Sequence, residues 1–271
     1  MSTTSSTAVV QRGTERRTNY VLLGLLVPVI IVLLAPSLVV LPMSVSENPV
    51  LSWPPQGFTL RWYGKLIANP GWLDSAKNSL EVAFAATGLS LVVGIPAGLT
   101  FGSIHWRGKQ LALAFVVAPL VIPTIILAIG MYEVYARLGL VDLWGLAVGH
   151  AVIGTPFVVV TTMLAVRQID PVLLLAARSL GAPPFSVFIH VTLPTVALGV
   201  LSGAVFAFVA SWDEVVIANF LTTPTFKTIP VLMWDQLTEG SDPTVAAMAS
   251  TLFIVTVSIT LVLAFISKSR R

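Results

Sequence analysis

The sequence predicts an all-α integral membrane protein with six transmembrane helices. Hydrophobic residues fill 56% of its 271 positions and charged residues only 10%, whereas soluble domains carry about 25% charged residues. Six runs of at least 22 residues contain no Asp, Glu, Lys or Arg, and each could cross a hydrocarbon core of about 30 Å. These runs lie at residues 20–41, 82–104, 110–132, 143–166, 191–212 and 245–266. The absence of cysteine excludes disulfides, thiol catalysis and cysteine metal sites.

Both ends of the chain are polar. Residues 1–19 are rich in Ser, Thr and Arg, and we expect a disordered cytoplasmic tail there. The first transmembrane helix follows at 20–43. It is longer than the apolar core of a signal peptide, about 7 to 15 residues, and no obvious cleavage site follows it, so we expect an uncleaved span. A short cytoplasmic C-terminus is predicted at 268–271.

A long polar loop at 44–75 separates the first span from the predicted core transmembrane domain at 76–267. The loop contains Trp53, Trp62 and Trp72. Tryptophan suits a membrane–water interface, and packing within the loop is an equally good interpretation. Nearer the C-terminus we expect a short helix at 228–238 on the outer face.

The basic residues predict the orientation, because cytoplasmic loops carry an excess of Lys and Arg. With a cytoplasmic N-terminus, 10 of the 15 basic residues lie inside, and the opposite orientation inverts this bias. Both termini are therefore expected in the cytoplasm. The inside set is Arg12, Arg16, Arg17, Arg107, Lys109, Arg167, Arg178, Lys268, Arg270 and Arg271.

Two features of the spans concern packing. Gly94, Gly98 and Gly102 recur every four residues in the second span. Small residues at this spacing line one helix face and predict a close approach by another helix. Pro119 and Pro123 predict a kink in the third span.

Two other features of the sequence could indicate nucleotide binding or proton transfer, but each is a weak signal. Gly102 and Gly108-Lys109 imitate a phosphate-binding loop, but the glycine spacing is one residue too long and Gln110 replaces the required Ser or Thr. The chain is therefore not expected to hydrolyse ATP by that route. His150 lies inside the fourth span, where a hydrogen bond within the bundle is the simpler expectation and a proton relay the functional alternative. The three histidines are scattered, and no metal site is predicted.

The most informative stretch, 168–194, connects the fourth and fifth runs. A short helical segment with Ala176 and Ala177 precedes Gly181, which can adopt φ > 0 and turn the chain sharply. Pro184 then opens a second short helix, because proline suits the first helical turn. With little charge of its own, this helix–turn–helix is expected to dock another protein.

The pattern resembles the EAA loop of ABC-importer permeases, with Leu175 at the position of that family's glutamate. The matching positions are Ala176, Ala177, Gly181, Val191, Leu193 and Pro194. The resemblance implies a type I ABC-importer permease fold and a coupling loop at 168–194 that contacts an ATPase subunit. On the resemblance alone, a glutamate at position 175 should be tolerated. The implied ATPase-contact residues are Ala176, Ala177, Gly181, Pro184 and Phe185.

The same resemblance implies partners. These are a homologous second permease subunit, two ATP-binding subunits, an extracytoplasmic solute-binding protein and the lipid bilayer, with no nucleic acid. ATP and Mg²⁺ would be bound by the ATPase subunits, and this chain would hold no cofactor. The chain is thus expected to be a transport subunit, not an enzyme, in the bacterial cytoplasmic (inner) membrane.

A second resemblance concerns the solute. The segments 57–63, 211–221, 228–231 and 242–247 resemble those of spermidine/putrescine-type permeases, which implies a small cationic solute, a polyamine. The adjacent carboxylates of Asp213 and Glu214 follow the fifth run, near the outer end of its helix, and are costly to desolvate. The predicted substrate-pathway residues are Asp213, Glu214, Trp212, Glu133 and Tyr132.

Within this set we expect different roles. Adjacent helical positions point about 100° apart, so only one of the two carboxylates, Asp213, is expected to face the pathway. Trp212 or Tyr132 would offer a cation–π surface, and Glu133 a second anion. The alternative is a structural acidic pair, capped by neighbouring backbone or bonded to a basic residue such as Lys227.

Other functions remain open on the sequence. The solute could be an opine, an amino-acid derivative or another amine. An ion-coupled secondary transporter is less favoured, because no inverted repeat of short, broken hydrophobic segments is found. A membrane-embedded enzyme is also less favoured, because paired histidines, a His-Glu-x-x-His motif and a serine nucleophile elbow are all missing from the sequence.

Overall fold

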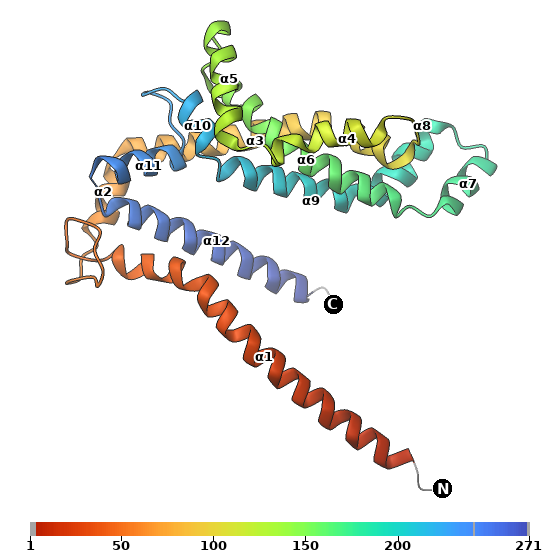
Figure 1. The fold of residues 1–271 in the computed structure, drawn as a ribbon, viewed down its shortest axis with the longest axis horizontal. Helices are drawn as coiled ribbons and strands as arrows, with labels where there is room; N and C mark the ends of the chain where they lie inside the picture. Colours follow the sequence, from red (N-terminus) through yellow and green to blue (C-terminus); the bar gives the residue numbers. More distant parts are fainter. Residues whose placement is uncertain (1–3, 241, 270–271) are drawn as a thin grey trace. The chain divides into compact units, whose positions relative to one another are not determined.

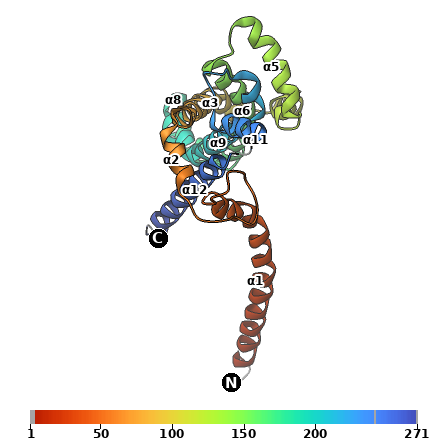
Figure 2. The ribbon, with the colours of Figure 1, turned by 90° about the vertical axis from the view of Figure 1, so that its left-hand side faces the viewer.

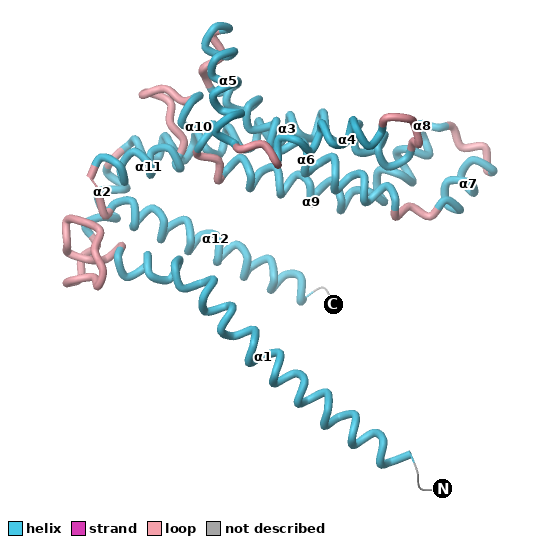
Figure 3. Tube along the Cα trace, viewed as in Figure 1, coloured by secondary structure: helices cyan, strands magenta, loops and turns pink. Residues whose placement is uncertain are grey.

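The structure is a computed structural model that describes residues 4–240 and 242–269, with side chains for 24–240, 242–262 and 265. Figure 3 shows helices and loops throughout this part. The helical elements are α1 (Thr4–Met43), α2 (Arg61–Ala68), α3 (Pro70–Ser103), α4 (Lys109–Val117), η1 (Ala118–Leu120), α5 (Thr124–Leu138), α6 (Leu143–Arg167), α7 (Pro171–Ser179), α8 (Pro184–Val187), η2 (Phe188–Thr192), α9 (Leu193–Trp212), α10 (Val216–Leu221), α11 (Ile229–Glu239) and α12 (Thr244–Ser269). The short helix expected at 228–238 is confirmed as α11.

The chain forms two compact units, Met1–Ala68 with Gln236–Arg271, and Asn69–Asp235. In the first unit, α12 contacts both α1 and α2. Figure 1 shows α1 and α12 close together near the loop after α1 and farther apart towards the termini. The Ser250 hydroxyl donates to the carbonyl oxygen of Val40 at 3.4 Å where these two helices meet.

Two predicted segments contain helices that were not expected from the sequence. α1 is already helical at Thr4, so the described part of the predicted disordered tail belongs to the first helix. The predicted loop at 44–75 contains α2 and the start of α3. Asn69 caps α3 by accepting a hydrogen bond from the backbone N–H of Gly71 at 2.9 Å, and Pro70 occupies the first turn. This pair is a helix start signal inside an otherwise polar segment.

The tryptophans of this region take different environments. Trp62 and Trp72 are each only 3% exposed, whereas Trp53 is 62% exposed. The indole N–H of Trp62 donates to the carbonyl oxygen of Ser46 at 2.7 Å. Packing inside the protein therefore describes Trp62 and Trp72, and a place at the membrane interface stays a prediction for Trp53.

Three long helices, α3, α6 and α9, pack together in the second unit, and α6 contacts both of the others. Figure 2 looks along these helices and shows them grouped, with α5 projecting to one side. A Cβ atom added to Gly94, Gly98 or Gly102 would lie 2.6–2.7 Å from side chains of α6. The close helix approach predicted from the glycine repeat is thus confirmed, and the helix that approaches is α6.

A second glycine face comes from α9. A Cβ atom on Gly203 would lie 2.8 Å from the Cα of Val158, and one on Gly199 would lie 2.9 Å from the carbonyl oxygen of Thr161. Glycines of α3 and α9 therefore bring both backbones close to α6. As a result α6 is more buried than any other candidate span of the described residues.

The predicted third span, 110–132, is not one straight helix. Its two halves, Lys109–Leu120 and Thr124–Leu138, meet at an angle of 92°. Pro119 lies in the 3₁₀ turn η1, and Pro123 directly precedes α5. Proline removes a backbone donor and clashes with the preceding turn, so two prolines this close break the helix. The predicted kink is confirmed, but it is a sharp break.

The count of spans depends on this break. Five helices are long and apolar enough to cross a membrane, and the bent pair makes a sixth if it acts as one span. The five are Gly24–Met43, Pro70–Ser103, Leu143–Arg167, Pro184–Trp212 and Thr244–Val262. The six-span prediction holds with the bent pair included.

Candidate functional site

The predicted coupling loop forms two short helices around a left-handed glycine. Asp170 begins α7 by accepting a hydrogen bond from the backbone N–H of Val172 at 2.9 Å. Gly181 has a φ of 79°, and α8 begins at Pro184. The π-helical turn η2 (Phe188–Thr192) then joins α8 to α9. The backbone predicted for this loop is confirmed.

The five predicted ATPase-contact residues are not equally accessible. Gly181, Pro184 and Phe185 are exposed, with 76% of Phe185 accessible. Ala176 is exposed, whereas its neighbour Ala177 is half-buried. Four of the five are therefore open to a partner, and Ala177 also packs against its own chain.

One leucine anchors the coupling loop to the helical core. Leu174 packs against a buried cluster of Val166, Ile169 and Val196, which come from α6, the link that follows it and α9. The loop is therefore coupled to the bundle through apolar contacts at the start of α9. A displacement of α7 would act on α9 through these contacts.

The acidic pair, Asp213 and Glu214, lies at the other end of α9. This helix has 20 residues, a length of about 30 Å. Figure 1 shows α7 and α8 at one end of the α3–α6–α9 core and α10 at the other. One helix thus joins the coupling loop to the acidic pair.

The two carboxylates differ in their surroundings. Oε1 of Glu214 accepts hydrogen bonds from the backbone N–H groups of Val216 at 2.7 Å and Ile217 at 2.9 Å, so Glu214 caps α10. Asp213 is exposed, and its carboxylate makes no hydrogen bond or ion pair with the described residues. The backbone at the start of α10 thus engages the Glu214 carboxylate, whereas the Asp213 carboxylate is exposed; that Asp213 faces the pathway stays a prediction.

Burial raises the pKa of the Glu214 carboxyl above its ordinary value of 4.5. The hydrogen bonds from Ile217 and Val216 lower this pKa in part, and the nearby charge of Asp213 raises it. Desolvation is the largest cause, because burial disfavours the charged form of a carboxyl group.

The two aromatic residues of the predicted pathway contact other rings. Trp212 stacks on Phe208, with ring centroids 6.2 Å apart and an angle of 13° between planes. Tyr132 meets Phe220 edge to face at 6.4 Å. The second contact brings α5 against α10, near the acidic pair.

The nearby charged residues are already paired. Lys227 Nζ lies 2.6 Å from Asp235 Oδ2, so the alternative of an ion pair between Lys227 and the acidic pair is wrong. Glu133 pairs with Arg137 one turn along α5, and both side chains are exposed. Glu133 is therefore not an unpaired anion in this structure.

Two hydrogen bonds that join α3 to the segment leading into α11 were not predicted from the sequence. Asn78 Nδ2 donates to the carbonyl oxygen of Lys227 at 3.0 Å, and Ser79 Oγ accepts from the backbone N–H of Ile229 at 2.8 Å. These bonds join α3 to residues about 150 positions later in the chain. No local pattern signals them, because both partners are ordinary polar groups until the fold brings them together.

His150 is 2% exposed, and its Nδ1 lies 2.8 Å from Ser211 Oγ. The expectation of a hydrogen bond within the bundle is confirmed. Its Nε2 has no hydrogen-bond partner among the described residues. The bond ties α6 to α9 two residues before the acidic pair.

Comparison with known proteins identifies the family. Residues 94–271 match the family described as the inner membrane component of binding-protein-dependent transport systems. The chain belongs to this family. This permease is 30% identical over 205 residues to the spermidine/putrescine transport system permease protein PotC of Escherichia coli K12, covering 75% of this chain and 77% of that protein. It is 29% identical over 232 residues to the putrescine transport system permease protein PotI of the same strain, covering 80% of each.

Solved structures support the fold of the permease. A bacterial ABC transporter that imports the acidic polysaccharide alginate matches with a TM-score of 0.67 at 16% identity, over 94% of this chain and 97% of that one. The MetNI methionine ABC transporter matches with a TM-score of 0.59 at 18% identity, over 69% and 89%. The ABC-importer permease fold is therefore confirmed. With the family match, it makes the chain a membrane transport subunit and not an enzyme.

A pocket of about 230 Å³ opens directly after the acidic pair of the permease. Its walls come from α5, α10 and α11 and are mostly apolar, with Asn219 as a polar group. The lining residues are Ile125, Val215, Val216, Asn219, Phe220 and Trp234. The pocket is lined from Val215 onwards, two residues after the exposed Asp213, and an apolar pocket of this kind suits an alkyl chain.

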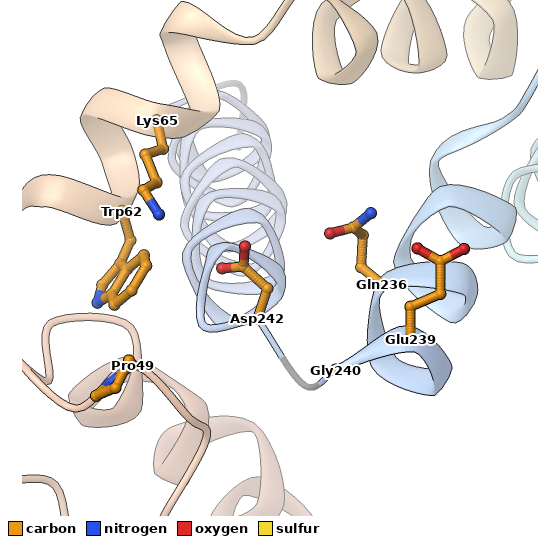
Figure 4. A pocket seen from close by; sticks show the side chains of 7 residues that line it. All are labelled: Pro49, Trp62, Lys65, Gln236, Glu239, Gly240 and Asp242. Atoms are coloured by element: carbon orange, nitrogen blue, oxygen red, sulfur yellow. The ribbon is translucent and has the colours of Figure 1, made fainter.

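A second pocket, of about 340 Å³, lies in the first unit of the permease and is drawn in Figure 4. It is lined by Pro49, Trp62, Lys65, Gln236, Glu239, Gly240 and Asp242. The Asp242 carboxylate accepts hydrogen bonds from the backbone and hydroxyl of Thr244, so it caps α12. The Lys65 ammonium lies 4.7 Å from the centre of the Trp62 ring. Two charged groups that line this pocket, the Asp242 carboxylate and the Lys65 ammonium, thus already have partners.

Proposed function

We propose that this permease forms half of the translocation pathway of an ATP-driven importer for a polyamine, such as spermidine or putrescine. The observation that carries the proposal is the arrangement along α9, with an exposed docking loop at its start and the exposed Asp213 beyond its end. The similarity to PotC and PotI supports the solute class. An exposed carboxylate beside aromatic rings is the chemistry that attracts an alkylammonium ion.

The proposed assembly contains four kinds of chain. A homologous permease subunit would supply the other half of the pathway, and two ATP-binding subunits would bind ATP and Mg²⁺. An extracytoplasmic solute-binding protein would deliver the solute, in keeping with the family description. This chain contributes the docking loop, the long helix α9 and the carboxylate at the outer end.

The proposed orientation has both termini in the cytoplasm of a bacterial cell and the acidic pair outside. The bias of basic residues supports it, and it places the coupling loop where ATP is. The natural chain has no cysteine, so single-cysteine labelling reports one position at a time. An impermeant thiol reagent should label Ser52→Cys and not Ser186→Cys in intact cells. Outside labelling of Ser186→Cys would overturn the orientation.

The proposed transport step is alternating access. Closure of the two ATPase subunits would pull on α7, and Leu174 would pass the displacement to the buried cluster at the start of α9. The carboxylate of Asp213 would hold the cationic end of the solute while the outer mouth is open. The ring of Trp212, which is half-buried and stacks on Phe208, would offer its other face to the same charge.

Reconstitution tests the function. The permease, its partner permease and the ATPase subunits are placed in proteoliposomes with the solute-binding protein, and uptake of labelled spermidine and putrescine is measured. We expect uptake only with ATP. Uptake that follows an ion gradient without ATP would make the chain a secondary transporter. ATP-dependent uptake of an opine or amino-acid derivative, with no polyamine uptake, would retain the importer and overturn the polyamine.

A further inference from the structure

The coupling loop exposes a large apolar surface. Five large apolar side chains of α7, α8 and the turn between them are 51–87% exposed: Val172, Leu173, Leu175, Leu180 and Phe185. Figure 1 shows α7 beyond the ends of α6 and α9, away from the middle of the core. Apolar side chains gathered on an exposed segment mark an interaction site.

The helical geometry of α7 separates an inward face from an outward face. Successive residues of a helix point about 100° apart. Leu174 packs on the buried cluster at the start of α9, so it marks the inward direction. On this wheel Val172 and Ala176 point about 160° away from Leu174, and Ala177 only about 60° away. The exposed state of Ala176 and the half-buried state of Ala177 agree with this assignment.

The outward face carries no charge. Its residues, which point at least about 100° away from Leu174, are Val172, Leu173, Leu175, Ala176 and Ser179. The Asp170 carboxylate is occupied as the cap of α7. Arg178 is exposed, but it points about 40° from the inward direction on the same wheel. Attraction between opposite charges can therefore contribute little to a contact made by this face.

We infer that the ATPase partner receives this outward face of α7 in an apolar cleft, with no cation opposite Leu175 and with Ala176 as the point of closest approach. The inference rests on the proposed function and specifies the partner's surface. A cation buried against Leu175 would lose its hydration without gaining a partner. Ala176 ends at its Cβ, so the cleft can approach the backbone of α7 there. Ala177 has a different role, because its side chain points towards the bundle and packs the loop against it.

An apolar cleft and the polar contact implied by the resemblance predict opposite effects of a glutamate at position 175. A glutamate at position 175 should be tolerated if the ATPase of this chain offers the polar contact of the family. In an apolar cleft the same carboxylate would be buried without a partner, and binding should weaken. The Leu175→Glu variant therefore distinguishes the two cases.

Binding of the cognate ATPase to the solubilised, full-length permease tests the inference. The bound ATPase is measured between about 0.1 and about 1 M NaCl, where the screening length falls from about 10 to about 3 Å. We expect retention by the wild type to change by less than about twofold, because an apolar contact is not screened. Leu175→Glu should lower the affinity by about tenfold or more, and Leu175→Met should bind like the wild type.

A matched pair of alanine variants tests the two faces of α7. Ala176→Leu should lower ATPase affinity without changing the thermal stability of the free permease. Ala177→Leu should lower that stability, because the added side chain points towards the bundle. Equal effects of the two variants on stability would overturn the assignment of faces.

The remaining outcomes separate this inference from the proposed function. A several-fold loss of wild-type binding with salt, or full binding of Leu175→Glu, would overturn the apolar cleft and leave the importer intact. If Leu175→Glu changes only the association of the free permease with lipid vesicles, the face lies on lipid and the inference is wrong. If the wild type binds its ATPase at no salt concentration, the proposed function itself fails.

Discussion

Nδ1 of His150 and Oγ of Ser211 lie 2.8 Å apart and join α6 to α9 just before the acidic pair. Both residues are buried, and Nε2 of the same imidazole has no partner among the described residues. The bond is therefore the polar contact that fixes this end of α9 against the most buried helix of the core. Because Ser211 is two residues before Asp213, we expect this hydrogen bond to fix the position of Asp213.

Loss of this bond should destabilise the permease. Ser211→Ala would leave Nδ1 of His150 buried without its partner, at a cost of about 1–3 kcal/mol. Ser202→Ala is the control, because Ser202 is exposed on the same helix and its hydroxyl donates only to the carbonyl oxygen of Leu198. Thermal unfolding of the solubilised permease measures the difference. Equal melting temperatures for the two variants would contradict the prediction.

The two carboxylates should respond differently to substitution. Asp213→Asn should impair polyamine uptake by about tenfold, the effect of losing roughly 1.4 kcal/mol of interaction, while assembly and basal ATP hydrolysis persist. Glu214→Ala should instead lower stability by about 0.5–2 kcal/mol, because it removes the cap of α10. Asp74→Asn, at an exposed position of α3, controls for the loss of one negative charge. Wild-type uptake by Asp213→Asn, or loss of assembly, would return Asp213 to a structural role.

The raised pKa of Glu214 predicts a pH dependence. Between its ordinary value of 4.5 and its raised value, the folded protein holds a proton that the unfolded chain has released. The contribution of Glu214 to stability is therefore greatest at low pH and declines as pH rises through this window. Glu214→Gln should remove this decline. Hydrogen exchange of the α10 amides against pH measures it, and parallel curves for the two proteins would refute it.

Gly181 should tolerate asparagine better than valine. A side chain in the left-handed region costs about 1–2 kcal/mol, and asparagine visits it far more readily than a β-branched residue. A Cβ atom at this position meets nothing within 4 Å, so the effect comes from the backbone and not from a clash in the free permease. We expect Gly181→Val to remain in the membrane and to lose solute-stimulated ATP hydrolysis. Full stimulation in Gly181→Val would remove the coupling role from this turn.

The contact between α3 and α6 should be sensitive to one methyl group. A Cβ atom on Gly98 would lie 2.6 Å from Cβ of Thr162 and 2.9 Å from the carbonyl oxygen of Val159, whereas one on Gly88 would meet nothing within 4 Å. Gly98→Ala should therefore destabilise the permease by about 1–3 kcal/mol. Gly88→Ala, in the same helix, should be neutral or slightly stabilising. Thermal unfolding of both variants measures this, and a neutral Gly98→Ala would contradict the assigned contact.

The backbone of the coupling loop could be predicted from the sequence because its conformation follows local rules. An N-capping aspartate, a glycine that can adopt φ > 0 and a proline that begins a helix each act within a few residues. The glycine repeat at Gly94, Gly98 and Gly102 also predicted a close helix contact, since spacing alone places these residues on one face. The repeat did not say which helix would approach.

Much of the candidate site was not predictable in the same way. In the sequence Asp213 and Glu214 are adjacent, and Lys227 was a possible partner for them. In the fold Lys227 pairs with Asp235 instead. The Glu214 carboxylate accepts hydrogen bonds from the backbone at the start of α10. Two prolines predicted a kink but not an angle of 92°. These outcomes depend on which groups the packing brings within hydrogen-bond reach.

The sequence by itself determined the membrane class of the chain, its long helices, the glycine face of α3 and the turn at Gly181, because hydropathy, helical period and backbone sterics act locally. Only the tertiary structure decided that α6 is the helix enclosed by two glycine faces, that His150 bonds to Ser211, and that Asp213 is the carboxylate left exposed. A hydrogen bond or a close contact requires atoms within a few ångströms of each other, and for residues far apart in the chain that proximity is a property of the packed helices.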